Sequence, residues 1–198
     1  MLCRIDEALA YPANQVGEES QRLARHPDRL SAGLVLLSSF EEDFYRTNGL
    51  PHQLSQCFAR HRKAVFDERA FFMACAEAQQ LLHHCYFLDD TLSALYLALR
   101  RLGLRGPVHL RRPGQTFAVS CQLGSPGWEL PVAIKQLWDL DWTPESVEAR
   151  MEESGGEIAL EARPVLVLAG EPGALDPQLS SELERRALVS GGKLCGLL

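Results

Sequence analysis

Cysteine and histidine side chains recur in the first half of the chain at spacings that suit a metal ion. Cys57 and His61 are four residues apart, which places both side chains on one face of a helix. His84 and Cys85 follow in a later helical segment, so two neighbouring helices could offer a tetrahedral zinc site. His83 and His84 diverge by about 100° on a helix and cannot easily share one site. The competing interpretation places Cys57 and Cys85 on apolar stripes and the histidines in solvent.

The same residue types could instead support nucleophilic catalysis. Cys85 or Cys121 could act as the nucleophile, with His83 or His109 as the base. Such a pair needs to meet in space and to be oriented by a third group. No known catalytic motif surrounds these cysteines. A small Cys/His-dependent or zinc-dependent enzyme is therefore the alternative hypothesis, and zinc is expected as a cofactor only under that alternative.

Two of the short acidic runs, Asp89-Asp90 and Glu41-Glu42-Asp43, offer carboxylates that could do chemistry. Paired carboxylates can hold a magnesium ion or act as general acid and base. Each run also has a simpler explanation, because an aspartate caps a helix well and a run of acidic residues is typical of a solvated helix face. We therefore draw no catalytic site from either run.

Arginine and tryptophan residues gather in the middle of the chain, and both types are enriched at the hot spots of protein interfaces. The arginines could receive an acidic segment of a partner protein, or they could simply mark the positively charged end of a helix. The tryptophans could equally fill a core. The candidate partner-binding residues are Arg101, Arg105, Arg111, Arg112, Trp138 and Trp142.

The composition is that of a folded protein, with 46% hydrophobic and 23% charged residues among 198. A net charge of -6 argues against nucleic acid as a partner, because no basic surface would attract phosphates. We expect no membrane partner, because no apolar run approaches the roughly 20 residues that span a bilayer. The first residues lack a signal-peptide pattern, and six cysteines without a CxxC pair suit reduced thiols. These features predict a cytoplasmic protein.

Helical periodicity of the apolar residues dominates the first half of the chain. Asp67 is a plausible cap for the strongest of the helices, and Gly103 is expected to end the last. The helices are predicted over residues 18–26, 32–45, 51–66, 67–85 and 89–102.

Beyond Pro107 the apolar runs become short and are bounded by Pro and Gly, which is typical of strands. Thr143-Pro144-Glu145 reads as the start of a helix, with a hydroxyl cap, a proline in the first turn and an acidic residue. Strands are predicted over residues 108–111, 117–123, 130–137, 158–160 and 165–169. Two helices are predicted, over residues 143–153 and 176–189.

These elements predict an α+β fold, with an N-terminal helical array followed by a mainly antiparallel small sheet with two helices. Few of the connections between strands are long enough for parallel crossovers. We expect a helical region over residues 1–106 and an α+β region over residues 107–198, packed together as one globular unit. The favoured function is that of a non-catalytic protein-interaction protein: an adaptor, a chaperone-like protein or a regulatory subunit. It would bind another protein through apolar surface and the arginine cluster. A homodimer is the alternative assembly.

Overall fold

The protein is described by a computed structural model that covers residues 1–59, 67–124, 127–154, 158 and 160–198. Its centre is a five-stranded sheet in which every neighbouring pair is antiparallel, in the order β1-β2-β5-β3-β4. The strands are β1 (Leu2–Arg4), β2 (Gly33–Leu36), β5 (Val165–Ala169), β3 (Gly106–Arg111) and β4 (Val119–Leu123). A second, three-stranded sheet has the order β6-β7-β8 and consists of Ala174–Asp176, Ala187–Ser190 and Lys193–Leu197. The α+β class is thus confirmed.

The central strand β5 and its neighbour β2 are apolar along their whole length because both faces of the sheet are covered. Successive side chains of a strand point to opposite faces. Gly33 allows the two strands to approach, because a Cβ atom there would lie 2.5 Å from the carbonyl oxygen of Val167. Two separate hydrophobic cores result. One contains Leu34, Leu36, Val165 and Val167, and the other contains Val35, Leu166 and Leu168.

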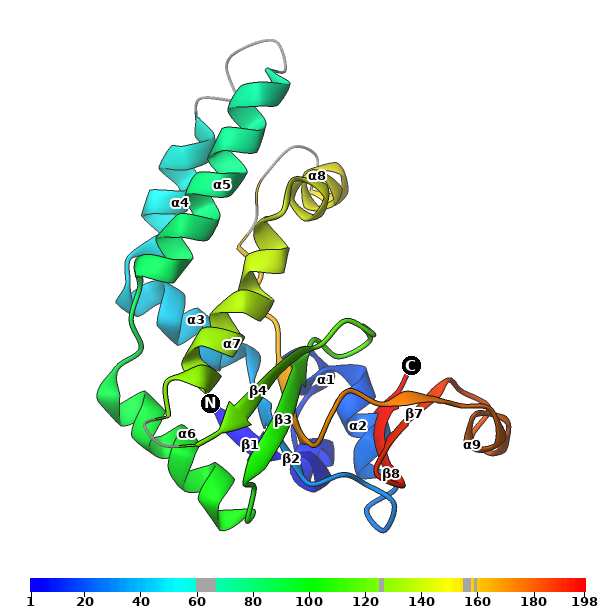
Figure 1. Cartoon of the computed structure of the whole chain (residues 1–198). Coiled ribbons are helices and arrows are strands. Elements are labelled where there is room, and N and C mark those ends of the chain that lie inside the picture. Colours follow the sequence, from blue (N-terminus) through cyan, green and yellow to red (C-terminus); the bar gives the residue numbers. More distant parts are fainter. Residues whose placement is uncertain (60–66, 125–126, 155–157, 159) are drawn as a thin grey trace.

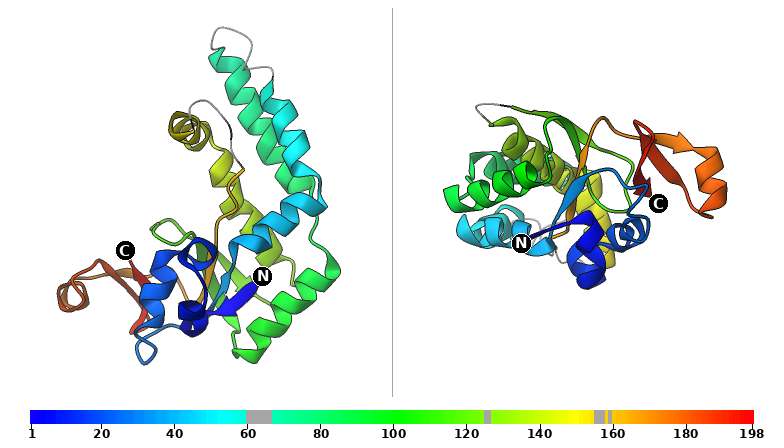
Figure 2. Two further views of the ribbon diagram at one scale, coloured as in Figure 1. Left: turned by 180° about the vertical axis from the view of Figure 1, so that it is seen from behind. Right: turned by 90° about the horizontal axis from the view of Figure 1, so that it is seen from below.

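Helices from both halves of the chain cover the sheet (Figures 1 and 2). The first core receives α3 (Ser38–Thr47), α4 (Leu50–Ala59), α5 (Glu68–His84), α6 (Asp89–Arg101), α7 (Glu129–Asp139), the 3-10 helix η3 (Leu140–Trp142) and α8 (Pro144–Glu153). The second core receives the 3-10 helix η1 (Ile5–Ala10), α1 (Ala13–Val16), α2 (Glu18–Ala24) and the small sheet with α9 (Pro177–Glu182). Helices α4 and α5 project away from the sheet as a hairpin (Figure 1). None of the helices in the described ranges combines the length and the apolar character that a membrane span requires.

Local capping chemistry was predicted correctly. The Asp67 carboxylate accepts a hydrogen bond from the Ala70 backbone nitrogen at 3.2 Å and starts α5. The Thr143 hydroxyl accepts one from the Ser146 nitrogen at 3.3 Å and starts α8. Both helices therefore begin where their side chains satisfy a backbone donor.

The predicted helix over residues 32–45 is wrong in its first part, which forms β2 before α3 begins at Ser38. The spacing of Leu34 and Leu37 suggested a helical face, but every residue of β2 is buried between two strands. The first half of the chain is therefore not purely helical, since it contributes β1 and β2 to the sheet.

Two errors affect the second half. Residues 130–137 form α7 rather than a strand, with Pro131 in the first turn and a buried face of Leu130, Ala133, Ile134 and Leu137 at helical spacing. The predicted helix over residues 176–189 ends at Glu182, and its last part forms β7, which pairs with both neighbouring strands. The predicted strand over residues 158–160 is not formed at residues 158 and 160, which the structure describes. Residue 159 and residues 60–66, the predicted end of a helix, lie outside the described residues.

Candidate functional site

The candidate arginines divide into a buried pair and an exposed group. Arg111 ends β3 and donates two hydrogen bonds to the Glu19 carboxylate, at 2.7 and 2.6 Å, and one to the Cys195 carbonyl at 2.6 Å. The same carboxylate accepts the backbone N–H groups of Gly114 and Leu197, at 2.6 and 2.7 Å. Arg111 therefore joins β3, α2 and β8 inside the protein.

Arg112 follows directly and lies on the other side of the sheet, inside the first core. It donates to the Glu41 carboxylate at 2.8 and 3.0 Å and to Asp141 at 2.5 Å, while Arg163 pairs with the second oxygen of Asp141. Burial alone would lower the pKa of Arg112, but the charges of Glu41 and Asp141 outweigh burial and raise it. The Tyr45 hydroxyl completes the network by donating to Glu41 at 2.7 Å. Arg112 thus has a structural role.

Both candidate tryptophans are completely buried. The Trp138 ring lies 4.9 Å from Phe44, centroid to centroid, and Trp142 stacks on Phe58 at 6.0 Å. The interpretation as partner-contacting surface is therefore wrong for Arg111, Arg112, Trp138 and Trp142. The carboxylates and aromatic rings that these four side chains contact come from distant parts of the chain. No local sequence pattern therefore distinguishes the four residues from surface residues.

The exposed group consists of Arg100 and Arg101, in the last turn of α6, and Arg105 just beyond it. Gly103 has a φ of 68°, and the Leu104 nitrogen donates to the Leu99 carbonyl at 3.0 Å, which ends the helix in a left-handed turn. None of these three arginines forms an ion pair with any residue in the described part of the chain.

Two of these arginines border a hollow of about 410 Å³ between the end of α6 and the end of β4. We call it the α6–β4 groove. Its lining combines apolar leucine side chains with the two arginines, and the Tyr96 hydroxyl donates to the Gly127 carbonyl. The lining residues are Tyr96, Leu99, Arg100, Leu104, Arg105, Leu123, Gly124 and Gly127.

An exposed aromatic side chain follows the groove in the sequence. Trp128 is 68% exposed and directly follows Gly127, and Val132 is exposed one turn further along α7. The next residue, Glu129, is the acidic group nearest in sequence, and its charge contributes to the raised pKa of Tyr96, which burial mainly causes. The groove therefore combines guanidinium groups with leucine side chains. Trp128, one of the tryptophans in the middle of the chain, directly follows its last lining residue, Gly127, and is a candidate aromatic anchor.

The proposed metal ligands are placed separately as far as the structure describes them. Cys57 lines a hollow on α4 with Glu77 and Leu81 of α5. His84 Nδ1 lies 2.7 Å from the Gln80 carbonyl oxygen, and His61 lies outside the described residues. Within the described ranges no three His, Cys, Asp or Glu side chains gather as metal ligands would.

Cys85 belongs to a cluster that joins the end of α5 to α7. The Lys135 ammonium donates to the carbonyl oxygens of His83, at 3.0 Å, and of Cys85. His83 Nε2 lies 2.5 Å from the Asp139 carboxylate, and burial raises the pKa of Asp139 to about 6 despite the neighbouring His83 and Lys135. The sequence analysis selected His83 and Cys85 but missed Lys135 and Asp139, which belong to another helix.

The candidate nucleophiles lie in environments that disfavour a thiolate. Burial raises the pKa of Cys121 to about 11, and it also raises that of Cys85. His109 is buried on β3, where its Nδ1 lies 2.9 Å from the Gly170 carbonyl oxygen and burial lowers its pKa. Reactive cysteines need the opposite shift, toward a lower pKa.

Comparison with known proteins assigns no class to this chain. No family model matches it, and no curated protein matches its sequence.

Proposed function

We propose that the protein is a non-catalytic protein-interaction protein, whose α6–β4 groove receives an acidic segment of another protein that also carries apolar side chains. The observation that supports this proposal best is the pair of arginines, Arg100 and Arg105, that border an apolar hollow without forming an ion pair among the described residues.

The chemistry of the groove suits such a segment. A guanidinium group can bind a carboxylate with two parallel hydrogen bonds, and these arginines stand out on a protein whose net charge is -6. The apolar floor offers burial for one or two aliphatic side chains of the partner. Trp128 supplies a large aromatic surface beside it, of the kind that dominates the binding energy of many interfaces.

Other features agree with a binding role in the cytoplasm. The raised pKa of the thiols at Cys85 and Cys121 disfavours the enzyme alternative, because the thiol rather than the thiolate is populated at neutral pH. None of the six cysteines, all of which lie in the described residues, forms a disulfide. This state is the one expected in a reducing compartment.

The partner can be found by placing a photo-crosslinking amino acid at position 128 in living cells and identifying the attached protein by mass spectrometry. Position 185, exposed after α9 on a different part of the molecule, serves as the control site. We expect crosslinks from position 128 alone, to a segment rich in Asp and Glu. Crosslinks that join only two copies of this chain would replace the proposal with a homodimer.

Binding of the purified partner then tests the arginines. The double variant Arg100→Glu/Arg105→Glu is expected to weaken binding at least about tenfold, which corresponds to about 1.4 kcal/mol. The matched variant Arg185→Glu/Arg186→Glu carries the same change of charge elsewhere and should bind as the unaltered protein does. Equal binding by both double variants would contradict the proposal.

A further inference from the structure

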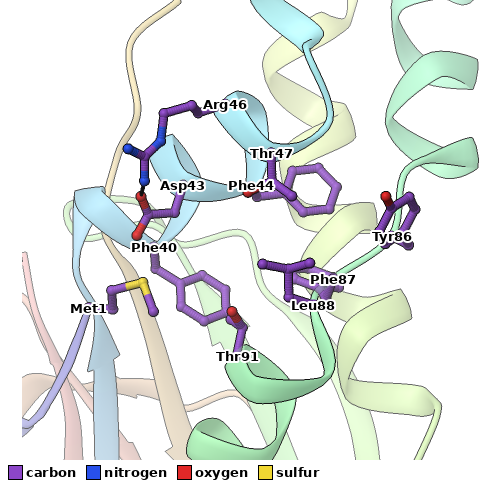
Figure 3. A pocket seen from close by; sticks show the side chains of 10 residues that line it. All are labelled: Met1, Phe40, Asp43, Phe44, Arg46, Thr47, Tyr86, Phe87, Leu88 and Thr91. Atoms are coloured by element: carbon purple, nitrogen blue, oxygen red, sulfur yellow. Dashed lines mark hydrogen bonds and ion pairs between the residues drawn. The ribbon is translucent and has the colours of Figure 1, made fainter.

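A second hollow, of about 160 Å³, lies between α3 and the loop that joins α5 to α6 (Figure 3). It is separate from the α6–β4 groove, because it borders the first turn of α6 rather than the last. Three phenylalanines form an aromatic cluster at its base: the Phe44 and Phe87 centroids are 4.6 Å apart, and those of Phe40 and Phe87 are 5.9 Å apart. The lining residues are Met1, Phe40, Asp43, Phe44, Arg46, Thr47, Tyr86, Phe87, Leu88 and Thr91.

The loop that forms one side of this hollow is held in place by a side chain of the opposite side. The Asn48 amide donates to the Tyr86 carbonyl oxygen at 3.0 Å, and the Tyr86 nitrogen donates back to the Asn48 oxygen at 3.2 Å. Yet Tyr86 is 65% exposed, and Leu88 and Met1 are also exposed. Apolar side chains therefore remain in water around an opening whose backbone is already fixed. Such preorganisation lowers the entropy that a ligand must overcome.

One carboxylate, that of Asp43, lines the opening together with the Arg46 guanidinium. Asp43 lies between Arg46 and the Phe40 ring (Figure 3) and pairs with Arg46. The Arg46 side chain is 77% exposed and that of Asp43 only 34%, so the carboxylate lies closer to the hollow than the guanidinium does. An exposed ion pair of this kind contributes little free energy, so Asp43 can exchange its partner at low cost. Two further carboxylates, Asp89 and Asp90, stand between the lining residues Leu88 and Thr91 in the sequence.

We propose that this hollow binds a small organic cation: an ammonium group carried on an aromatic ring or a short aliphatic body. A cavity of about 150 Å³ lined by apolar side chains is large enough for benzene. Aromatic faces attract cations electrostatically, and a carboxylate forms a short, charge-assisted hydrogen bond with an ammonium group. The ring of the ligand packs on the phenylalanines, and its ammonium group binds Asp43.

Three probes of the same shape test the charge selectivity: phenethylammonium, 2-phenylethanol and phenylacetate. Titration calorimetry of the whole protein should show saturable binding of phenethylammonium, and binding of phenylacetate that is at least about tenfold weaker, a difference of about 1.4 kcal/mol. Phenylacetate binding as tightly as phenethylammonium, or no saturable binding of any probe to the folded protein, would overturn the proposal.

Two variants locate the binding. Asp43→Asn should remove the preference for the cation, so that phenethylammonium binds no more tightly than 2-phenylethanol. Thr91→Phe should fill the hollow and abolish binding of the cation, whereas Thr116→Phe, in an exposed loop elsewhere, should leave it unchanged. Circular dichroism tests whether each variant is folded. If Thr91→Phe is unfolded, the result for Asp43→Asn alone decides the proposal. Unchanged selectivity in Asp43→Asn would place the cation elsewhere.

Discussion

Two adjacent arginines, Arg111 at the end of β3 and Arg112 directly after it, bind carboxylates that belong to different cores. Each guanidinium is buried against carboxylates from distant residues, Glu19 for one and Glu41 for the other. Ion pairs of this kind add little net stability when complete, but they are costly when one member is lost, because an uncompensated charge remains buried.

Arg112→Leu is therefore expected to be severely destabilising, because Glu41 would lose its guanidinium partner and Asp141 would keep only Arg163. Removing one member of a buried ion pair costs about 3–5 kcal/mol, which urea unfolding can measure. The control is Arg101→Leu, at an exposed position without an ion pair in the described part of the chain, which should change the free energy of unfolding by less than about 0.5 kcal/mol. If Arg112→Leu lowers the free energy of unfolding as little as Arg101→Leu does, Arg112 does not form this buried ion-pair network.

Asp139 gives a prediction for the dependence of stability on pH. Its pKa is raised from 3.8 to about 6 in the folded protein, so the folded state binds more protons than the unfolded state between these values. Stability from this group is present at low pH and is lost as the pH rises through about 6. In Asp139→Asn this loss is absent, so the variant should gain stability relative to the unaltered protein over that range, by up to about 3 kcal/mol.

Urea unfolding at several pH values measures this difference, and the exposed Asp28→Asn is the matched control. The difference in stability between Asp139→Asn and the unaltered protein should grow from about pH 4 to 6 and then level off. A difference that shrinks as the pH rises would mean that the ion pair with His83 outweighs the burial of the carboxylate.

At the scale of single elements, helix α8 starts at a cap whose contribution can be measured. Thr143→Ala removes the hydroxyl that accepts the Ser146 N–H, and loss of such a cap costs about 1 kcal/mol. Thermal or urea unfolding of this variant should show that decrease, while Thr116→Ala, in an exposed loop, should not. Equal stability of the two variants would indicate that another group satisfies the freed N–H.

The elements that the sequence predicted well are those that local chemistry determines. Asp67 and Thr143 cap their own helices, and Gly103 adopts the left-handed conformation that ends α6. The errors occur where tertiary contacts decide. A short apolar run such as residues 33–36 is compatible with a buried helix or a buried strand, and it becomes a strand because β1 and β5 lie on either side of it.

The candidate site was predictable only in part for a similar reason. Arg101 and Arg105 lie on either side of a helix end that the sequence reveals, and both are exposed. Arg111 and Arg112 differ from them only through carboxylates that are far away in the sequence. Trp128 belongs to the same tryptophan-rich stretch as Trp138 and Trp142, and only the fold shows that Trp128 is exposed while the other two are buried.

In the whole molecule, α6 connects the two proposed binding sites. Its first turn contributes Thr91 to the aromatic hollow, and its last turn contributes Arg100 to the α6–β4 groove. The small sheet with α9 lies at another end of the molecule (Figure 2), where Arg111 and Glu19 fix β8 to the large sheet. No residue of the small sheet is among the described residues that line either hollow.

The position of β5 between β2 and β3 has a consequence for folding. Residues 33–36 and 108–111 both pair with residues 165–169, so the centre of the sheet is completed by a strand that enters late along the chain. Until that strand arrives, β2 and β3 each present an unpaired apolar edge, and closing so long a loop costs entropy before any contact compensates it. We therefore expect the pairing of β5 with β2 and β3 to form late in folding.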